Sequence, residues 1–191
     1  VCSSDLKGYE GKTGTAAVLA AIDDGKAYMW VRGSFDAFAW FGGSGGTIVL
    51  IIAILLFSKR ADYLTVGKLS LGPGIFNINE PILFGAPIIM NPMMFIPFVF
   101  VPMINAVLAY GATRLGWLSQ VVSLTPWTTP APIGASWAAN WTLSPVVMCL
   151  ICMVMSAVIY LPFLRAYERS LMKTEVEKAK AAVPVAETVS Q

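Results

Sequence analysis

Residues 74–92 read GIFNINEPILFGAPIIMNP and combine three Asn, one Glu and three Pro within a strongly apolar chain. Pro and Asn interrupt helices, and an ionised carboxylate is costly to place in hydrocarbon. Glu80 therefore needs partners or a polar cavity. This stretch is predicted to be an irregular hairpin that does not cross a membrane.

The composition of the whole chain places it in a membrane. Of 191 residues, 57% are hydrophobic and only 13% are charged, whereas soluble domains are charged at about a quarter of their positions. A net charge of +2 gives no indication of a nucleic-acid partner. The chain has no His, which excludes His metal sites, His general bases and Ser-His-Asp triads. No metal or cofactor is expected.

Three uncharged runs are long enough to cross a bilayer, for which about 20 helical residues are needed. They cover residues 37–57, 93–113 and 141–163. The first run contains GGSGG at 42–46, a sequence that permits close helix approach or marks a broken helix. Pro97 and Pro102 are expected to kink the second run. The predicted fold is an all-α integral membrane protein with about three transmembrane helices.

The positions of the basic residues indicate on which side of the membrane each span ends. Basic residues at 59–60 and after 164 mark the cytoplasmic side, so the first and last spans both end there. That arrangement requires 74–92 and 125–140 to enter and leave on one side, as two re-entrant hairpins, with 61–73 as a polar connection. Broken elements that meet near the membrane midplane are typical of transporters.

Three segments are predicted along the chain. Residues 1–34 form a surface loop whose first residues look artefactual, 35–164 are embedded in the membrane, and 165–191 form a cytoplasmic basic helix and tail, with 184–191 as the tail. Because the chain begins at Val1 without Met, it is expected to be the C-terminal part of a longer protein.

Glu80 is the leading candidate for a functional residue. Between Lys68 and Arg165 the sequence has two charged residues, Glu80 and Arg114. Arg114 lies at the end of a span, from which its long side chain can reach the membrane–water interface. Two interpretations of Glu80 remain open. It is either a protonated group that satisfies backbone at the hairpin tip, or a carboxylate that faces a cavity and holds a ligand.

Amides and an aromatic ring near Glu80 suit a sugar. Asn79 carries both donors and acceptors, as sugar hydroxyls require, and Asn77 and Asn91 either share that role or cap the hairpin arms. Trp127, in the sequence TPWTTP, offers a flat face to a sugar ring or anchors the chain at the interface. Thr128 adjoins it and is included as a candidate sugar contact.

These residues resemble a known family. The opening stretch is similar to the N-x-N-E-P-I-x-F-G-x-P-I-x-x-N-P signature of enzyme IIC permeases, lactose/cellobiose/chitobiose class, of the phosphoenolpyruvate-dependent phosphotransferase system. Three further pieces resemble that family, and the resemblance covers roughly residues 35–170. They are FDAFAWFGGSGGTIVL at 35–50, PWTTPAPIG at 126–134 and YLPFLRAYE at 160–168.

The resemblance implies part of the transport domain of a dimeric permease in the bacterial inner membrane. Its N-terminal half dimerises, and its transport half, with two re-entrant hairpins, carries a disaccharide that phosphorylated enzyme IIB then modifies at the 6-hydroxyl. Glu80 would lie beside that hydroxyl as the catalytic residue, and Asn79 and Trp127 would contact the sugar. The family's upstream His and dimerising half are not in these 191 residues, and ASWAAN at 135–140 departs from its relatives. The chain alone is therefore expected to be inactive.

Two other functions fit the same residues. In an ion- or proton-coupled sugar transporter, Glu80 would carry the coupling proton. In a non-catalytic membrane bundle, neither Glu80 nor Trp127 would affect sugar binding. The energy source for uptake and the effect of substitutions at these two positions distinguish the three alternatives.

Overall fold

The computed structural model describes residues 35–86, 88, 90–119, 121 and 125–189, and within them the regular elements are all helices, with no strand. The predicted all-α fold is confirmed, while the predicted loop at 1–34 lies outside the described residues. The helices follow in the order α2 (Asp36–Ala39), α3 (Thr47–Phe57), α4 (Ala61–Ile75), α5 (Glu80–Gly85), α6 (Pro92–Arg114), α7 (Ala131–Ala138) and α8 (Ser144–Val189).

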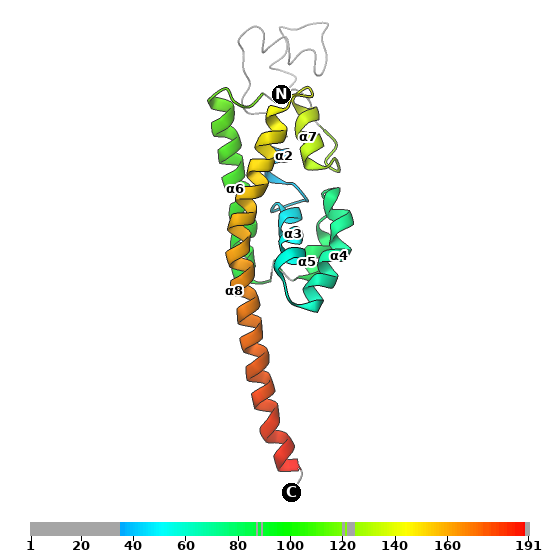
Figure 1. The fold of residues 1–191 in the computed structure, drawn as a ribbon, viewed down its shortest axis with the longest axis vertical. Coiled ribbons are helices and arrows are strands. Elements are labelled where there is room, and N and C mark those ends of the chain that lie inside the picture. Colours follow the sequence, from blue (N-terminus) through cyan, green and yellow to red (C-terminus); the bar gives the residue numbers. More distant parts are fainter. Residues whose placement is uncertain (1–34, 87, 89, 120, 122–124, 190–191) are drawn as a thin grey trace.

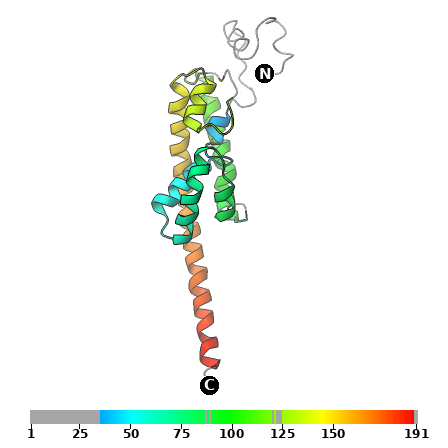
Figure 2. The ribbon, with the colours of Figure 1, turned by 90° about the vertical axis from the view of Figure 1, so that its right-hand side faces the viewer.

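Helices α6 and α8 lie side by side and form the spine of the molecule (Figure 1; Figure 2). Both are long and apolar enough to cross a membrane. Asn91 caps the start of α6 by accepting a hydrogen bond from the Met93 backbone N–H at 2.9 Å. Within the interface, Asn105 Nδ2 donates to Ser156 Oγ at 2.9 Å, a contact of the kind that joins helices in lipid.

The first predicted span, 37–57, is wrong as a single helix. The loop at 40–46 separates α2 from α3, and α3 has only 11 residues. Four glycines of that loop have φ between +66° and +93°, which no right-handed helix contains and which Gly adopts without a steric penalty. Eleven residues rise about 16 Å, well short of a hydrocarbon core of about 30 Å. The described residues therefore contain two helices of spanning length instead of about three.

The predicted polar connection at 61–73 is helix α4, which packs against α3. The polar residues Asp62 and Lys68 occupy its exposed face, whereas Gly67 and Gly74 are buried. A Cβ at Gly74 would lie 2.8 Å from Ile51 Cδ1. Small residues therefore bring α3 and α4 close together, as they do in membrane helix pairs.

The two predicted hairpins contain only short helices. Residues 74–92 hold the end of α4, a turn at 76–79 and the six-residue α5, and residues 125–140 hold a loop and the eight-residue α7. Among the described residues of these two segments, no helix is long enough to cross a bilayer. In Figure 1, α3, α4 and α5 lie below α2 and α7.

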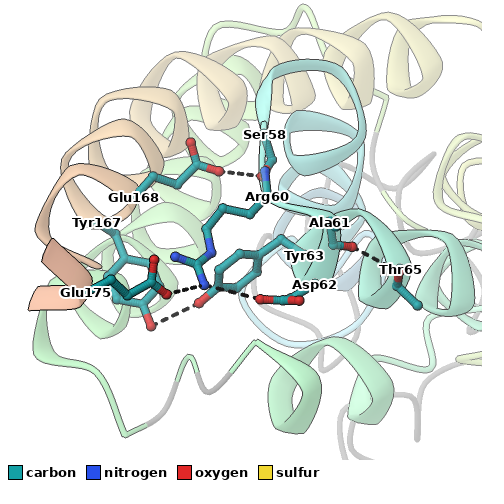
Figure 3. A network of polar contacts seen from close by, with 9 residues as sticks. All are labelled: Ser58, Arg60, Ala61, Asp62, Tyr63, Thr65, Tyr167, Glu168 and Glu175. Carbon is teal, nitrogen blue, oxygen red and sulfur yellow. Dashed lines mark hydrogen bonds and ion pairs between the residues drawn. The ribbon is translucent and has the colours of Figure 1, made fainter. Parts of the chain in front are cut away.

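Helix α8 runs without interruption past residue 164 to Val189, so the predicted boundary between span and basic helix is not a backbone break, and the predicted tail is helical as far as Val189. At the lower end of α3 and α4, α8 contacts the α3–α4 connection and the start of α4 through polar side chains (Figure 3). We call this group the Arg60 cluster. It comprises Ser58, Arg60, Asp62, Tyr63, Tyr167, Glu168 and Glu175.

Charge–charge and hydroxyl contacts hold the Arg60 cluster together. Arg60 Nη2 lies 2.8 Å from Glu175 Oε1 and 3.2 Å from Asp62 Oδ2. These two carboxylates, Glu175 first, raise the pKa of the Arg60 guanidinium. Tyr63 donates its hydroxyl hydrogen to Tyr167 Oη at 3.1 Å. The cluster ties the lower end of α3 and α4 to the outer part of α8.

Candidate functional site

Three loops that are far apart in the sequence enclose a cavity of about 340 Å³. They are the glycine-rich loop at 40–46, the α4–α5 turn at 76–79, and the loop at 125–130. The side chains that give the cavity its chemistry are Asp36, Trp40, Ser44, Asn77, Asn79, Glu80, Thr125, Trp127 and Thr129.

The structure brings four of the five sequence-predicted site residues to this one cavity. Asn77, Asn79, Glu80 and Trp127 all line it, although Trp127 lies about fifty positions further along the chain. Thr128 is not among the lining residues, whereas its neighbour Thr129 is. Residues of both predicted hairpins, 74–92 and 125–140, therefore line the same cavity.

Glu80 is the first residue of α5 and is exposed. Among the described residues its carboxylate makes no hydrogen bond or ion pair. That geometry does not match the interpretation in which Glu80 satisfies backbone groups at the hairpin tip. Its carboxylate oxygens remain able to accept hydrogen bonds from hydroxyl groups of a molecule in the cavity.

Trp127 supplies the aromatic surface of the cavity. The residue is 71% exposed and lies in a turn that precedes α7. An exposed indole beside a cavity offers a broad apolar face together with one N–H donor. An aromatic face combined with a carboxylate and amides is the mixture of apolar and directed polar groups that small-molecule sites use.

Asn79 is nearly buried and has one fixed contact. It is 7% exposed, and its Nδ2 donates to the Ser44 carbonyl at 3.0 Å. An Asn side chain has two donor hydrogens and an acceptor oxygen, so one donor and the oxygen are left for a ligand. Asn79 therefore both joins the glycine-rich loop to the α4–α5 turn and retains capacity for a hydroxyl.

Asn77 has a different set of partners, all of them backbone groups of the other two loops. Its Oδ1 accepts from the Gly42 N–H at 2.7 Å, and its Nδ2 donates to the carbonyls of Trp127 at 2.6 Å and Thr129 at 2.9 Å. Both donor hydrogens are used by these contacts. The residue has φ of +63°, a conformation in which Asn is enriched among non-glycine residues.

The glycine-rich loop and α2 also line the cavity, through Asp36, Trp40 and Ser44, which were not predicted from the sequence. The GGSGG motif was the available signal, but its place in an uncharged run led to a span assignment. The glycines are needed for close approach, since a Cβ at Gly43 would lie 2.6 Å from Asn79 Cγ. Tyr160 of α8 supports the loop from behind by donating to the Gly45 carbonyl.

Comparison with known proteins gives consistent matches. The family described as "Phosphotransferase system, EIIC" matches residues 7–102. The PTS system cellobiose-specific EIIC component of Lactococcus lactis is 50% identical over 157 residues, 82% of this chain and 32% of the relative. The PTS system lactose-specific EIICB component of Lacticaseibacillus casei is 36% identical over 185 residues, 92% of this chain and 32% of the relative.

A solved structure shares the fold as well as the sequence. The transporter ChbC, the IIC component from the N,N'-diacetylchitobiose-specific phosphotransferase system, superposes with a TM-score of 0.69 and is 37% identical. The match covers 74% of this chain and 33% of that one. The chain thus spans about a third of the length of the curated relatives and of the solved structure that it matches.

Proposed function

The chain belongs to the phosphotransferase system EIIC family, whose members are integral membrane permeases, and from that premise we propose that its three-loop cavity is the sugar site of such a permease. The observation that carries the proposal is the convergence of Glu80, Asn79 and Trp127 on one cavity. Its volume of about 340 Å³ lies within the range of small-molecule sites, about 300–1,000 Å³.

We propose a disaccharide as the substrate. Cellobiose, lactose and N,N'-diacetylchitobiose are the sugars in the names of the matched proteins, and all three are disaccharides. In this chain the indole of Trp127 would lie against the apolar face of one sugar ring. Asn79 would use its remaining donor and its acceptor oxygen on hydroxyl groups.

In the proposal, the Glu80 carboxylate binds the reactive 6-hydroxyl of the sugar. In the proposed reaction a phosphoryl group leaves the cysteine sulfur of phosphorylated enzyme IIB and forms a new bond to the sugar 6-oxygen. The proton of that hydroxyl passes to the Glu80 carboxylate and then to water. A positioned carboxylate supports such a transfer when it lies within about 2.6–3.2 Å of the hydroxyl oxygen.

The remaining parts of the proposal concern the whole permease. Apolar side chains on the outer faces of α6 and α8, such as Phe100, Val107 and Val154, are exposed and suit lipid. We propose that these faces contact the lipid bilayer and that the charged end of α8 lies in the cytoplasm. Dimerisation is assigned to regions of the permease outside this chain. Enzyme IIB, fused or separate, is the proposed phosphoryl donor.

Glu80→Gln, in the permease expressed at its full encoded length, tests the proposal. With phosphorylated enzyme IIB, sugar phosphorylation should fall by about a hundredfold or more, the usual contribution of a general base. Sugar affinity, measured by calorimetry, should change little because Gln keeps the size and an acceptor oxygen. Glu177→Gln is the matched control, since Glu177 is exposed on α8. Normal phosphorylation by Glu80→Gln would contradict the proposal.

Two further results would favour the other candidate functions. Sugar uptake that survives removal of enzyme IIB but stops with a protonophore would indicate a proton-coupled transporter. Normal phosphorylation by Glu80→Gln together with unchanged sugar binding by Trp127→Ala would indicate a membrane bundle without this site.

A further inference from the structure

We propose that Asn77 is a positioning residue, whose side-chain amide joins the three loops of the cavity and sets the place of Trp127, without itself binding the sugar. The inference rests on the proposed function, because it concerns the same sugar site. It assigns to Asn77 a role that differs from both roles left open by the sequence, a sugar contact and a cap of a hairpin arm.

The hydrogen-bond partners fix the orientation of the Asn77 amide. One partner is a backbone donor, Gly42 N–H, and the other two are backbone carbonyls, of Trp127 and Thr129. A flipped amide would place NH₂ against N–H and oxygen against two carbonyls. With both donor hydrogens committed to backbone groups, Asn77 has none left for a sugar hydroxyl.

Few other residue types fit this position. The φ of +63° favours Asn, Asp or Gly. Asp matches the shape and backbone preference of Asn, but an ionised carboxylate has no hydrogen to give to the two carbonyls. Space is also limited, since a Cβ on the neighbouring Gly43 would lie 2.9 Å from the Asn77 carbonyl oxygen.

Trp127 depends on this contact more than a buried side chain would. The residue is 71% exposed, so little packing holds its side chain in place. The loop that carries it is tied to the α4–α5 turn through the two carbonyls that Asn77 binds. Loss of both donors would release these carbonyls to water and allow the loop, with its ring, to move away from Asn79 and Glu80.

Asn77→Asp in the permease of full encoded length is the first test, with cellobiose as the probe. At pH 7 the Kd for sugar should rise by up to about tenfold, the loss expected for Trp127→Ala, because the carbonyls of Trp127 and Thr129 lose their donor and face a negative charge. As the pH falls towards about 5, the ratio of the variant's Kd to the parent's should decrease, since a protonated Asp regains one donor. A sugar affinity equal to the parent's would overturn the inference.

A double-mutant cycle separates positioning from direct contact. Trp127→Ala alone should weaken binding about tenfold. If Asn77 acts through Trp127, the double variant should bind no worse than Trp127→Ala, because coupled residues are not additive. If instead the two losses multiply to about a hundredfold, Asn77 acts independently of Trp127 and the inference fails.

The controls use residues of the same type. Asn91→Asp keeps the Oδ acceptor that caps α6 and should bind sugar as the parent does. If Asn77→Asp does not fold, Asn77→Gly supplies the same cycle, since it keeps the backbone conformation and removes only the amide. Normal binding by Trp127→Ala would count against the proposed sugar site, whereas additive losses count against this inference alone.

Discussion

The cavity and the Arg60 cluster are held together in opposite ways. Around the cavity, uncharged amides and hydroxyls bind backbone groups, and the loop glycines at 42, 43, 45 and 46 are all buried. In the Arg60 cluster, an Arg binds carboxylates whose side chains are 60% and 79% exposed. Close packing and neutral hydrogen bonds stabilise the loops of the cavity, whereas ion pairs stabilise the Arg60 cluster.

The surroundings of each region explain this difference. A charge taken out of water needs full compensation, whereas a neutral amide–carbonyl contact needs only its partner. Ion pairs that remain in water involve little desolvation, but they contribute only about 0–1 kcal/mol each. The cavity should therefore be intolerant of small steric changes, while the Arg60 cluster should tolerate the loss of a charge.

The largest effect is expected at Gly43. Gly43→Ala adds a Cβ 2.6 Å from Asn79 Cγ, at a φ of +93° that side chains rarely adopt. The free energy of unfolding should fall by about 3 kcal/mol or more, from strain and overpacking together. Thermal unfolding of the purified permease in nanodiscs measures this loss.

Gly116→Ala is the matched control for Gly43. Gly116 also has a positive φ, +75°, but nothing lies within 4 Å of an added Cβ. The free energy of unfolding of Gly116→Ala should fall by only about 1 kcal/mol, the cost of the backbone conformation. Equal losses at the two glycines would show that the close approach of the loops is not what Gly43 provides.

An intermediate effect is expected at Arg60. Arg60→Gln removes two ion pairs and a cation–π contact, with Arg60 Cζ 5.7 Å from the Tyr63 ring centroid. The expected loss is about 1 kcal/mol, smaller in high salt. The folded protein raises the pKa of Arg60, so the stabilisation is complete at neutral pH and is lost only in strong alkali. Melting scans that show a steadily growing difference between about pH 6 and pH 8 would contradict this.

The smallest effects are expected at the two carboxylates. Glu175→Gln should lower the free energy of unfolding by about 0.5 kcal/mol and Asp62→Asn by less, because Asp62 is more exposed and its contact is longer. Chemical denaturation at low and high salt compares the two. A greater loss at Asp62 would reverse the order that exposure implies.

Much of the site was predictable from local sequence. The stretch at 74–92 identified Asn79 and Glu80 because a carboxylate and amides in an apolar run require a polar cavity. The spans at 93–113 and 141–163 were close to α6 and the first part of α8, since long apolar runs without charge favour membrane helices. The motif also indicated the family that the comparisons show.

Other features were hidden because composition does not report backbone conformation. An uncharged run of 21 residues has the same hydropathy whether it is one helix or, as at 40–46, is broken by glycines with positive φ. The polar residues of α4 concealed a helix because they lie on its exposed face. In the first case the glycines at 42–46 were outweighed by the uncharged composition of the run. In the second case the helical spacing of α4 was outweighed by its polar residues.

The sequence by itself determined that this is a helical membrane segment with a polar stretch at 74–92, because charge and hydropathy restrict which residues enter lipid, and the motif in that stretch indicated the family. Only the tertiary structure decided what Asn77 does. Its partners lie 35, 50 and 52 positions away, and all three are backbone groups. Since every non-proline residue carries the same backbone donor and acceptor, no pattern of side chains could have revealed which ones this amide would bind.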